Sequence, residues 1–487
     1  MFSDYIYEMS SAKYEKKILL IDEDNLESKA MYSSVFTMNG FVVARYDNDL
    51  SFRIKYEELL KDHDSKIVVI AEPEQYIPYD IKSRFRAFVV SIANLFPKLN
   101  AETLRNYKSI DYNLLCSSYD TLYESLECKS DTEQFLKKSV YGVENVRNYM
   151  IRAKEKLIED AREANTHNDW FSVAEEKAYI DVLSVKYDVH MDTSEINGIF
   201  CDYILTNYGK LSGDIDSAGP VLVSKAMDYM DENSDRFVVI VMDGMAEFDW
   251  RVLEKSFDGI DYEKSSAFAM IPTVTSISRQ CLLSNKYPSQ LLEPWKQSKE
   301  KQEFVECAKG FGYTDQQISY MRGYDSDFGS MIRCGAVIIN EIDDMVHGQK
   351  QGRIGMYNDI GVMSKQGKLA EMVRRVLSKG LDVYITSDHG NTVRQGMGRL
   401  MGTGVETETK SRCMIVLKDF ADKSSLIEKY DLLEFPKTYL PKEYDYLICN
   451  AGDSFDVKGE EVMSHGGITI DEVIVPFIKI KAVNNNG

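Results

Sequence analysis

The second half of this chain contains short apolar runs separated by segments with helical spacing. These runs occupy residues 237–242, 336–339, 383–386, 414–417 and 473–480. Uninterrupted apolar runs of this length are typical of strands buried on both faces. Their alternation with helices predicts an α/β fold, a largely parallel sheet sandwiched by helices. In such sheets, functional side chains gather beyond the carboxyl ends of the strands.

The chain has 487 residues, about three times the ~150 residues of a typical domain. Residues 1–105 alternate strand and helix signals, as in a small α/β domain. Residues 106–212 have helical spacing, and we interpret them as a spacer or lid. A Gly/Ser/Asp-rich stretch, 209–220, precedes the larger α/β region 213–487. We therefore predict three parts: 1–105, 106–212 and 213–487.

The chain is acidic, with 58 Lys and Arg against 78 Asp and Glu and a formal charge of −20. This charge opposes non-specific binding to nucleic acid or anionic lipid, so such a partner would need a basic patch or bound cations. No apolar run approaches the ~18 residues of a membrane span. The polar N-terminus does not resemble a signal peptide, and the eight Cys include no CxxC pair. We expect a cytoplasmic protein with reduced thiols and no membrane contact.

Carboxylate and imidazole side chains follow the apolar runs. Asp243 comes directly after the first run, although a strand-end Asp-Gly is also common in turns. Asp343 and His347 follow the second run and are four residues apart, so on a helix they would face one ion. Asp344 is a competing carboxylate at that position.

Two further segments carry histidine next to glycine. Asp388 and His389 are adjacent at the end of the third run, and Gly390 allows a sharp turn there. Burying this pair without a partner would be costly, so it is the strongest single signal. His465 precedes the last run and is followed by two glycines, a setting also common in turns.

The combination is more informative than any one segment. All three histidines beyond residue 200 fall in these segments, which together offer three imidazoles and three carboxylates. Such N/O ligands predict two divalent metal ions, with zinc as the first choice and manganese as its main competitor. His63, His167 and His190 have polar surroundings and are interpreted as surface residues.

Two ions about 4 Å apart are suited to in-line displacement at phosphorus, which also needs a nucleophile. The segment PTVTSISR, 272–279, offers hydroxyls just ahead of a helical pattern, where an anion is favoured. A plain N-cap role is the alternative. Arg279 lies one turn further along, where it would hold a phosphate oxygen or remain a solvated helix charge.

The ordered motifs MDGM, PTVTSISR, DDMVHG, TSDHGN and SHGG resemble the alkaline phosphatase superfamily, and specifically the PglZ domain, from about residue 236 to the end. The P-T-x-T pattern implies Thr275 as nucleophile in preference to Thr273, with Ser276 a lesser candidate. The resemblance implies one metal held by Asp243, Thr275, Asp388 and His389, and a second held by Asp343, His347 and His465.

The N-terminal region, with IDED at 21–24 and FPKL at 96–99, looks like the leading region of PglZ proteins from BREX phage-defence systems. Other PglZ-domain proteins begin with a receiver module, which requires an Asp after its third strand. Here the run 67–71 is followed by Glu72, so we expect a receiver-like domain that is not phosphorylated. Asp22 and Asp24 are interpreted as solvated turn residues, with cation binding as the alternative.

The resemblance implies a metal-dependent phosphodiesterase that acts on nucleotides or nucleic acid, DNA or RNA, in a BREX-like defence context with other defence proteins as partners. A phosphomonoesterase and an assembly component with little activity are the alternatives. Basic residues near the site would bind a polyanion, or else belong to a solvated loop. They are Arg279, Arg394, Arg399, Lys410 and Arg412.

Overall fold

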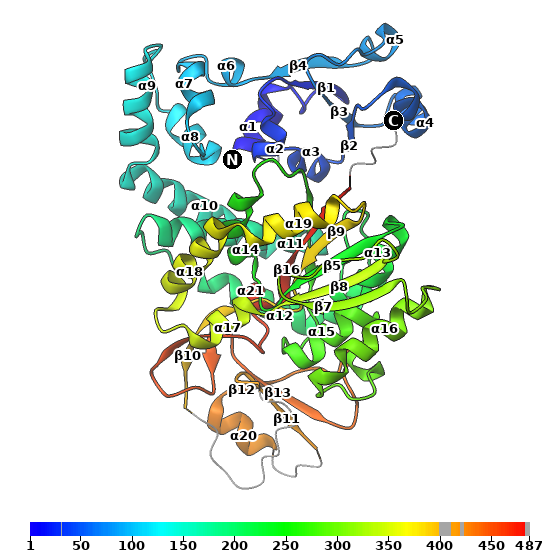
Figure 1. Cartoon of the computed structure of the whole chain (residues 1–487). Coiled ribbons are helices and arrows are strands. Elements are labelled where there is room, and N and C mark those ends of the chain that lie inside the picture. The colour runs from blue at the N-terminus through cyan, green and yellow to red at the C-terminus, as the bar shows by residue number, and fades with distance from the viewer. Residues whose placement is uncertain (31, 399–410, 419–422, 483–487) are drawn as a thin grey trace. The chain divides into compact units, whose positions relative to one another are not determined.

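The structure is a computed structural model, and it describes residues 1–30, 32–398, 411–418 and 423–482. The chain forms two compact units, residues 1–151 and 152–487, which are described separately (Figure 1). The division between them falls inside the segment 106–212 that we predicted as a helical region. The three-part division of the chain stays a prediction.

The first unit contains a parallel four-stranded sheet in the order β2-β3-β1-β4. Its core joins residues such as Leu19 and Val69 of the sheet with Phe52 and Leu60 of a covering helix. Three of the strands coincide with runs that the sequence predicts at 18–21, 42–44 and 67–71, whereas β4 was not predicted although four of its five residues are apolar. The strands are β1 (Lys17–Asp22), β2 (Val42–Arg45), β3 (Ile67–Ala71) and β4 (Arg86–Val90).

The strand order differs from that of a receiver module, which has the flavodoxin-like order 2-1-3-4-5. In this unit β3 lies between β2 and β1, so the similarity to a receiver is limited to a parallel α/β sheet. The helices are α1 (Phe2–Met9), α2 (Leu26–Ala30), α3 (Ser34–Met38), α4 (Asp49–Lys61), α5 (Tyr79–Lys82), α6 (Ile92–Leu95), α7 (Ala101–Asn106), α8 (Tyr112–Tyr119), α9 (Lys129–Phe135), the π-helical η1 (Leu136–Val140) and α10 (Val143–Glu163), which continues past residue 151.

Asp22, the last residue of β1, and Asp24 are neither solvated nor part of a group of metal-ligand type among the described residues. Asp22 is buried and accepts two backbone N–H groups at the start of α2, at 2.8 and 2.7 Å. Asp24 accepts the backbone N–H of Ile92 at 2.6 Å and pairs with Arg105 at 2.7 Å. Both carboxylates therefore stabilise the local backbone.

The second unit is built on a six-stranded sheet in the order β6-β16-β9-β5-β8-β7. The strands β9, β5, β8 and β7 are parallel, and β16 is antiparallel to both of its neighbours. The prediction of a mostly parallel sheet is confirmed. In chain order the strands are β5 (Phe237–Met242), β6 (Glu263–Phe268), β7 (Ile318–Arg322), β8 (Cys334–Ile339), β9 (Asp382–Thr386) and β16 (Ile474–Ile480).

The run 414–417 was wrongly predicted to belong to this sheet. It forms β11 (Met414–Leu417), which pairs with β13 (Asp445–Cys449) in a separate antiparallel sheet with β12 (Leu432–Glu434). Its apolar side chains pack in a small core of their own, which includes Ile415 and Leu447. A third sheet joins β10 (Thr392–Gly396), β14 (Asp453–Ser454) and β15 (Glu461–Ser464).

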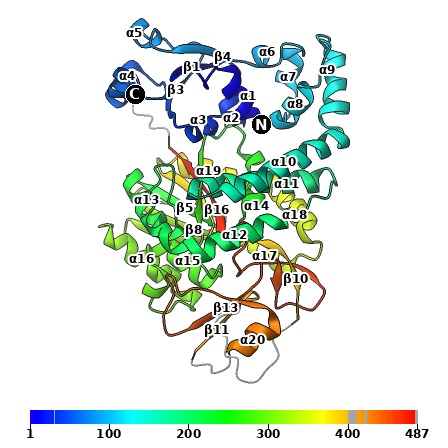
Figure 2. The same ribbon diagram turned by 180° about the vertical axis from the view of Figure 1, so that it is seen from behind.

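Helices cover both faces of the large sheet, as the two opposite views show (Figures 1 and 2). One face packs against α11, α14, α18 and α19 through a core that includes Trp250 and Val373. On the other face, Tyr229 of α13 packs against Tyr384 of β9. The helices are α11 (His167–Lys186), α12 (Ser194–Asn207), α13 (Ala226–Asn233), α14 (Glu247–Leu253), α15 (Thr275–Ser284), α16 (Glu300–Gly310), α17 (Glu341–Gly348), α18 (Gly352–Gln366), α19 (Lys368–Leu377), α20 (Lys423–Tyr430) and α21 (Ile470–Val473). Short 3₁₀ helices are η2 (Tyr208–Gly213), η3 (Val223–Lys225), η4 (Glu254–Phe257), η5 (Pro288–Gln290) and η6 (Gln297–Lys299).

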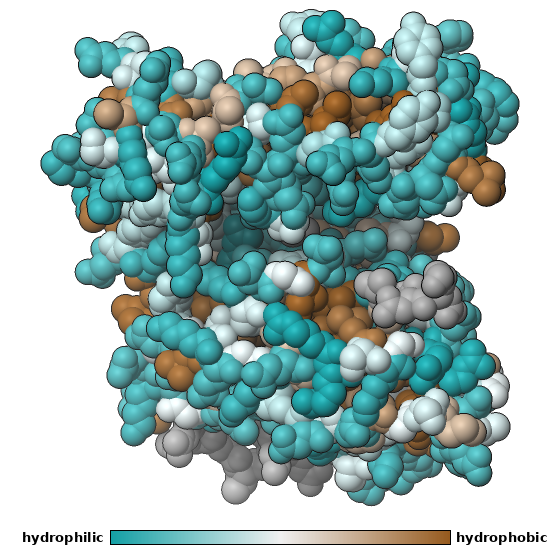
Figure 3. All heavy atoms as spheres, turned by 45° about the horizontal axis from the view of Figure 1, so that its top comes forward, coloured by the Kyte–Doolittle hydropathy of each residue, from teal (hydrophilic) through white to brown (hydrophobic). Residues whose placement is uncertain are grey.

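The surface reflects the acidic, charged composition. The face drawn in Figure 3 is mostly hydrophilic, with apolar patches among the polar residues. Within the described residues, no helix combines the length and the apolar character that crossing a membrane requires. All eight cysteines are free, and most of them are buried.

One histidine differs from its predicted surface position. His167, at the start of α11, is only 8% exposed. Its Nδ1 lies 3.1 Å from Asp214 and its Nε2 lies 3.6 Å from Asp216. The polar segment that follows α12 therefore packs back onto this histidine.

Candidate metal centre

The predicted ligands meet because three parallel strands end at the same edge of the large sheet. Asp243 follows β5, whose last residue pairs with the last residue of β8. Asp388 and His389 follow β9, which is the other neighbour of β5. Asp343 lies in the first turn of α17, directly after β8. The register of the sheet therefore brings together residues that are up to 146 positions apart in the sequence.

Asp243, Asp388 and His389 form what we call the Asp243 cluster. One ligand atom of each lies within 4.8 Å of the others. The Nε2 atom of His389 is 3.8 Å from an oxygen of Asp243 and 3.8 Å from an oxygen of Asp388. All three side chains are buried. This cluster is thus a closed group of two carboxylates and one imidazole.

Asp343, His347 and His465 form the second group, which we call the Asp343 cluster. Each oxygen of Asp343 lies 3.4 Å from the Nε2 atom of one histidine. The side chain of His347 is 44% exposed, so this cluster is open on one side. Asp344, the competing carboxylate, belongs to neither cluster.

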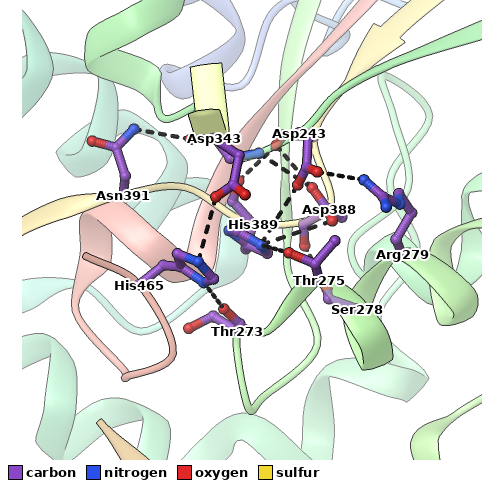
Figure 4. A network of polar contacts seen from close by, with 12 residues as sticks. Asp243, Thr273, Thr275, Ser278, Arg279, Asp343, Asp388, His389, Asn391 and His465 are labelled. Carbon is purple, nitrogen blue, oxygen red and sulfur yellow. Dashed lines mark hydrogen bonds and ion pairs between the residues drawn. The ribbon is translucent and has the colours of Figure 1, made fainter. Parts of the chain in front are cut away.

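The two clusters are parts of one site (Figure 4). The rings of His389 and His465 are stacked with centroids 4.1 Å apart. The backbone N–H of Asp343 donates to the carbonyl of Asp243 at 3.1 Å. Gly244 has φ +77°, and a Cβ on it would lie 3.4 Å from Asp343, so glycine suits both the turn and this close approach.

Hydrogen bonds fix how the two inner histidines present their rings. The Nδ1 atom of His389 lies 3.0 Å from the carbonyl oxygen of Gly390, and that of His465 lies 2.9 Å from the carbonyl oxygen of Thr273. Because a carbonyl only accepts, each Nδ1 carries the proton and donates it. Each Nε2 therefore directs a lone pair at the carboxylates, as in a metal-ligating histidine.

The carboxylates have oxygens that no protein donor satisfies. Asp243 Oδ1, Asp388 Oδ2 and Asp343 Oδ1 are buried and have no hydrogen-bond partner. Such atoms are costly unless a cation or a donor meets them. Three acceptor oxygens and two lone pairs that converge in this way fit divalent metal ions.

Burial also shifts the pKa values of the site residues. Burial and the charge of Asp388 raise the pKa of Asp243 to about 7. Burial, opposed by the charge of Arg279, raises the pKa of Asp388 to about 6. Burial lowers the pKa of His465 to about 4, which keeps its imidazole neutral. A neutral imidazole is the form that binds metal ions.

Thr275 is the hydroxyl that lies at the site. It is the first residue of α15 and is partly exposed, and its Oγ1 atom lies 3.0 Å from His389 Nε2. The N-cap of α15 is Val274, so the alternative N-cap role does not apply to Thr275. Thr273 is buried and bonds to the backbone of Gly467 at 2.9 Å, which is a structural role. Ser276 is also partly exposed, one residue further along the helix.

Arg279 is fully buried, so it is not a solvated helix charge, and the contact with a phosphate oxygen stays a prediction. Its Nη1 donates to Asp243 Oδ2 at 2.5 Å, and its Nε donates to Glu300 at 2.6 Å. Glu300 also accepts from Tyr320 and Arg322. Arg279 therefore holds one oxygen of Asp243 and leaves the other directed at the cluster.

Of the other predicted basic residues, the two that the structure describes offer little to a polyanion. Arg394 is buried and pairs with Glu472, which also binds the glycine turn after His465 through Gly467. Arg412 is 40% exposed and lies 3.3 Å from Asp456. Arg399 and Lys410 lie outside the described residues.

Two supporting residues escaped the sequence analysis. Glu300 lies 21 positions from Arg279 and has no motif around it. Asn391 follows the Asp-His-Gly motif, and its side-chain amide donates to Gly244 at 2.9 Å and to Asp249 at 2.6 Å. Asn391 is the last residue of the TSDHGN motif, and this position was the signal that could have found it.

An Asp/His centre of this composition at the carboxyl edge of a mostly parallel sheet is the kind of site that metal-dependent hydrolases use. The sequence profile of the BREX system PglZ alkaline phosphatase-like domain matches residues 221–480, more than half of the chain. The chain belongs to this family. No curated protein sequence matches it.

Solved structures of low sequence identity resemble about half of the chain. Murine ectonucleotide pyrophosphatase/phosphodiesterase 5 is 11% identical, with a TM-score of 0.35 and coverage of 50% of this chain and 88% of that chain. The human protein is 13% identical, with a TM-score of 0.36 and coverage of 50% and 87%. Phosphonoacetate hydrolase from Sinorhizobium meliloti 1021 is 10% identical, with a TM-score of 0.29 and coverage of 52% and 92%.

Proposed function

We propose that this hydrolase is a metal-dependent phosphodiesterase that acts on nucleotides or nucleic acid with Thr275 as its nucleophile. One observation carries the proposal. The Thr275 hydroxyl lies 3.0 Å from His389, where two clusters of ligand-type side chains adjoin. A nucleophile beside two metal sites is the arrangement that phosphoryl transfer requires.

Each cluster would hold one divalent ion. Asp243, Asp388 and His389, together with Thr275, would hold the first, and the Asp343 cluster would hold the second. The unpartnered oxygens of the three aspartates support this assignment. Nitrogen and oxygen ligands suit zinc best, and manganese is the alternative.

In the proposed reaction, the hydroxyl of Thr275 gives its proton to solvent and Oγ1 attacks phosphorus in line as the P–O bond to the leaving group breaks. The released alkoxide takes up a proton from water and leaves as the alcohol. The product is a covalent phospho- or nucleotidyl-threonine, which water then hydrolyses from the side of the Asp343 cluster. When bound, the ions would neutralise charge on the phosphoryl oxygens and favour the ionised hydroxyl. Arg279 acts as a positioning residue, because it fixes Asp243 from behind.

The charge of the residues around the site favours nucleotides over long nucleic acids as substrates. Among the predicted basic residues within the described ranges, Arg279 and Arg394 are buried and paired, and Arg412 is partly exposed beside Asp456. A long polyanion needs many exposed cations, and the chain has a net charge of −20. The family name supports a place in phage defence, with other defence proteins as partners in the cytoplasm.

Two alternatives differ in measurable ways. A phosphomonoesterase would prefer p-nitrophenyl phosphate to bis-p-nitrophenyl phosphate. An assembly component would bind metal without turning over either ester. The unpartnered buried carboxylates weigh against the assembly component, because a scaffold gains nothing from their cost.

The test is hydrolysis of both esters by the purified protein supplied with zinc or manganese, with metal content measured by mass spectrometry. We expect diester turnover that EDTA abolishes. Thr275→Ala should lose about 10³-fold or more in kcat. The matched control is Ser276→Ala, on the next residue of α15, which should stay within about 3-fold of the wild type. Metal-loaded protein without turnover of either ester would overturn the proposal.

A further inference from the structure

A cavity of about 310 Å³ opens at the carboxyl ends of β7 and β8. It is lined by residues that include Arg322, Tyr324, Asn340, Glu341 and Asp344. Two of these flank the Asp343 cluster in the chain, since Asn340 and Asp344 lie on either side of Asp343. None of its lining residues belongs to either metal cluster.

A hydrogen-bonded path also joins this cavity to the metal centre. Arg322 donates to Glu300, which accepts from Arg279, and Arg279 in turn holds Asp243. One chain of ion pairs therefore connects the cavity wall to a predicted metal ligand.

The walls of the cavity offer more hydrogen-bond acceptors than donors. Glu341 and Asp344 bring two carboxylates. The Oδ1 atom of Asn340 is buried and has no hydrogen-bond partner. Acceptors of this kind are satisfied by a ligand that carries hydroxyl or amine groups.

Two flat side chains complete the wall. The guanidinium of Arg322 is 50% exposed and is held in place by Glu300. Tyr324 is partly buried two residues further on. Nucleobases stack on aromatic rings and on arginine planes of this kind.

We propose that this cavity binds the nucleoside part of a ribonucleotide diester. The carboxylates of Asp344 and Glu341 accept hydrogen bonds from the ribose hydroxyls, as acidic residues do in other nucleotide sites. The base stacks on the exposed guanidinium of Arg322. The volume suits a single small ligand rather than a polymer. This inference rests on the proposed function, and it names the substrate class of the same site.

The test compares two diesters that differ only in the 2′-hydroxyl, the p-nitrophenyl esters of uridine and 2′-deoxyuridine 5′-monophosphate. The ratio of their kcat/KM values within one variant cancels general damage to the enzyme. We expect the wild type to favour the ribo substrate about 10-fold, the effect of one hydrogen bond to a charged group. In Asp344→Asn or Glu341→Gln the ratio should fall toward 1.

The matched control is Asp325→Asn, which makes the same change of charge on an exposed residue that does not line the cavity. Its ribo-to-deoxyribo ratio should equal that of the wild type. Binding of uridine alone, followed by saturation-transfer NMR, gives a readout that does not depend on turnover. Signal should be strong for the wild type and weak for Glu341→Gln.

The outcomes separate the two proposals. If no diester is hydrolysed by metal-loaded protein, the proposed function fails, and uridine binding still decides whether the cavity is a nucleoside site. If bis-p-nitrophenyl phosphate is hydrolysed but the wild-type ratio is 1 and uridine does not bind, the nucleoside site is refuted while the phosphodiesterase proposal stands.

Discussion

Replacing Lys177 with methionine should destabilise the second unit strongly, because this lysine is the centre of a buried ionic network. Lys177 is 2% exposed, and its ammonium lies 2.8 Å from both Asp181 and Asp471. Arg353 pairs with the same two carboxylates. The network also lies against the candidate metal centre. Gly390, next to His389, packs so closely on Asp471 that a Cβ on this glycine would lie 1.9 Å from the carbonyl oxygen of Asp471.

The size of the effect follows from the charges. Burial alone would raise the pKa of Asp471, but Lys177 and Arg353 hold it at about 2. Compared with an ordinary value near 3.8, this shift corresponds to about 2 kcal/mol of stability. Breaking a buried ion pair by removing one partner costs about 3–5 kcal/mol. Because Arg353 remains, we expect a loss near 3 kcal/mol at pH 7.

The loss should depend on pH in a defined direction. A carboxylate with a lowered folded pKa stabilises the native state above its unfolded pKa and loses that contribution as the pH falls through the folded pKa. For Asp471 this window lies between about pH 4 and pH 2. The difference between wild type and Lys177→Met should therefore be largest at neutral pH and shrink below about pH 4.

Urea unfolding followed by tryptophan fluorescence measures this unit alone, because Trp170, Trp250 and Trp295 all lie within residues 152–487. The control is Lys225→Met, which removes an exposed lysine 3.8 Å from Asp228 and should change stability by less than about 1 kcal/mol. Equal stability of Lys177→Met and wild type at pH 7 would refute the reasoning. So would a deficit that stays constant down to pH 3.

Two further substitutions probe the backbone and a second buried pair. Gly390→Ala should abolish diester hydrolysis and lower the melting temperature, because its Cβ would overlap a backbone carbonyl. The control is Gly361→Ala, in open space on α18. It should leave hydrolysis unchanged and keep the melting temperature the same or raise it slightly. The neighbouring carboxylates of Asp216 and Asp214 raise the pKa of His167, so the histidine stabilises the fold at low pH and loses this effect as the pH rises through the raised value. His167→Asn should therefore cost more stability at pH 6 than at pH 9 in urea unfolding, and a deficit independent of pH would contradict this.

Much of the candidate site was predictable because parallel strands bring their carboxyl ends to one edge. Asp243, Asp388 and His389 follow apolar runs that are typical of buried strands, so their meeting could be predicted without knowing the register. Arg279 was not predictable in this way. Its partner Glu300 lies on another helix, and nothing in the local sequence distinguishes a buried, paired arginine from a solvated one.

The fold was predicted best where strands are apolar on both faces. The strands β6 and β7 were missed because they lie at the edges of the sheet and carry polar or partly exposed residues. The run that forms β11 is fully apolar, yet it packs in its own small core. Apolar character therefore indicates burial, but it does not reveal in which core a strand is buried.

The two clusters should release their metal ions in a fixed order. The Asp243 cluster offers two carboxylates and one imidazole, all nearly inaccessible to solvent, whereas the Asp343 cluster offers one carboxylate and two imidazoles. The side chain of His347 is 44% exposed, so a chelator reaches the second cluster first. The greater negative charge of the first cluster also favours a divalent cation more strongly.

Graded dialysis against EDTA, with metal content measured by mass spectrometry, should therefore show one equivalent lost well before the other. Asp343→Asn should keep one equivalent, bound at the Asp243 cluster. Asp243→Asn should keep one equivalent at the Asp343 cluster, the site that EDTA empties first in the wild type. Simultaneous loss of both ions from the wild type would mean that the clusters share their ions as one cooperative centre.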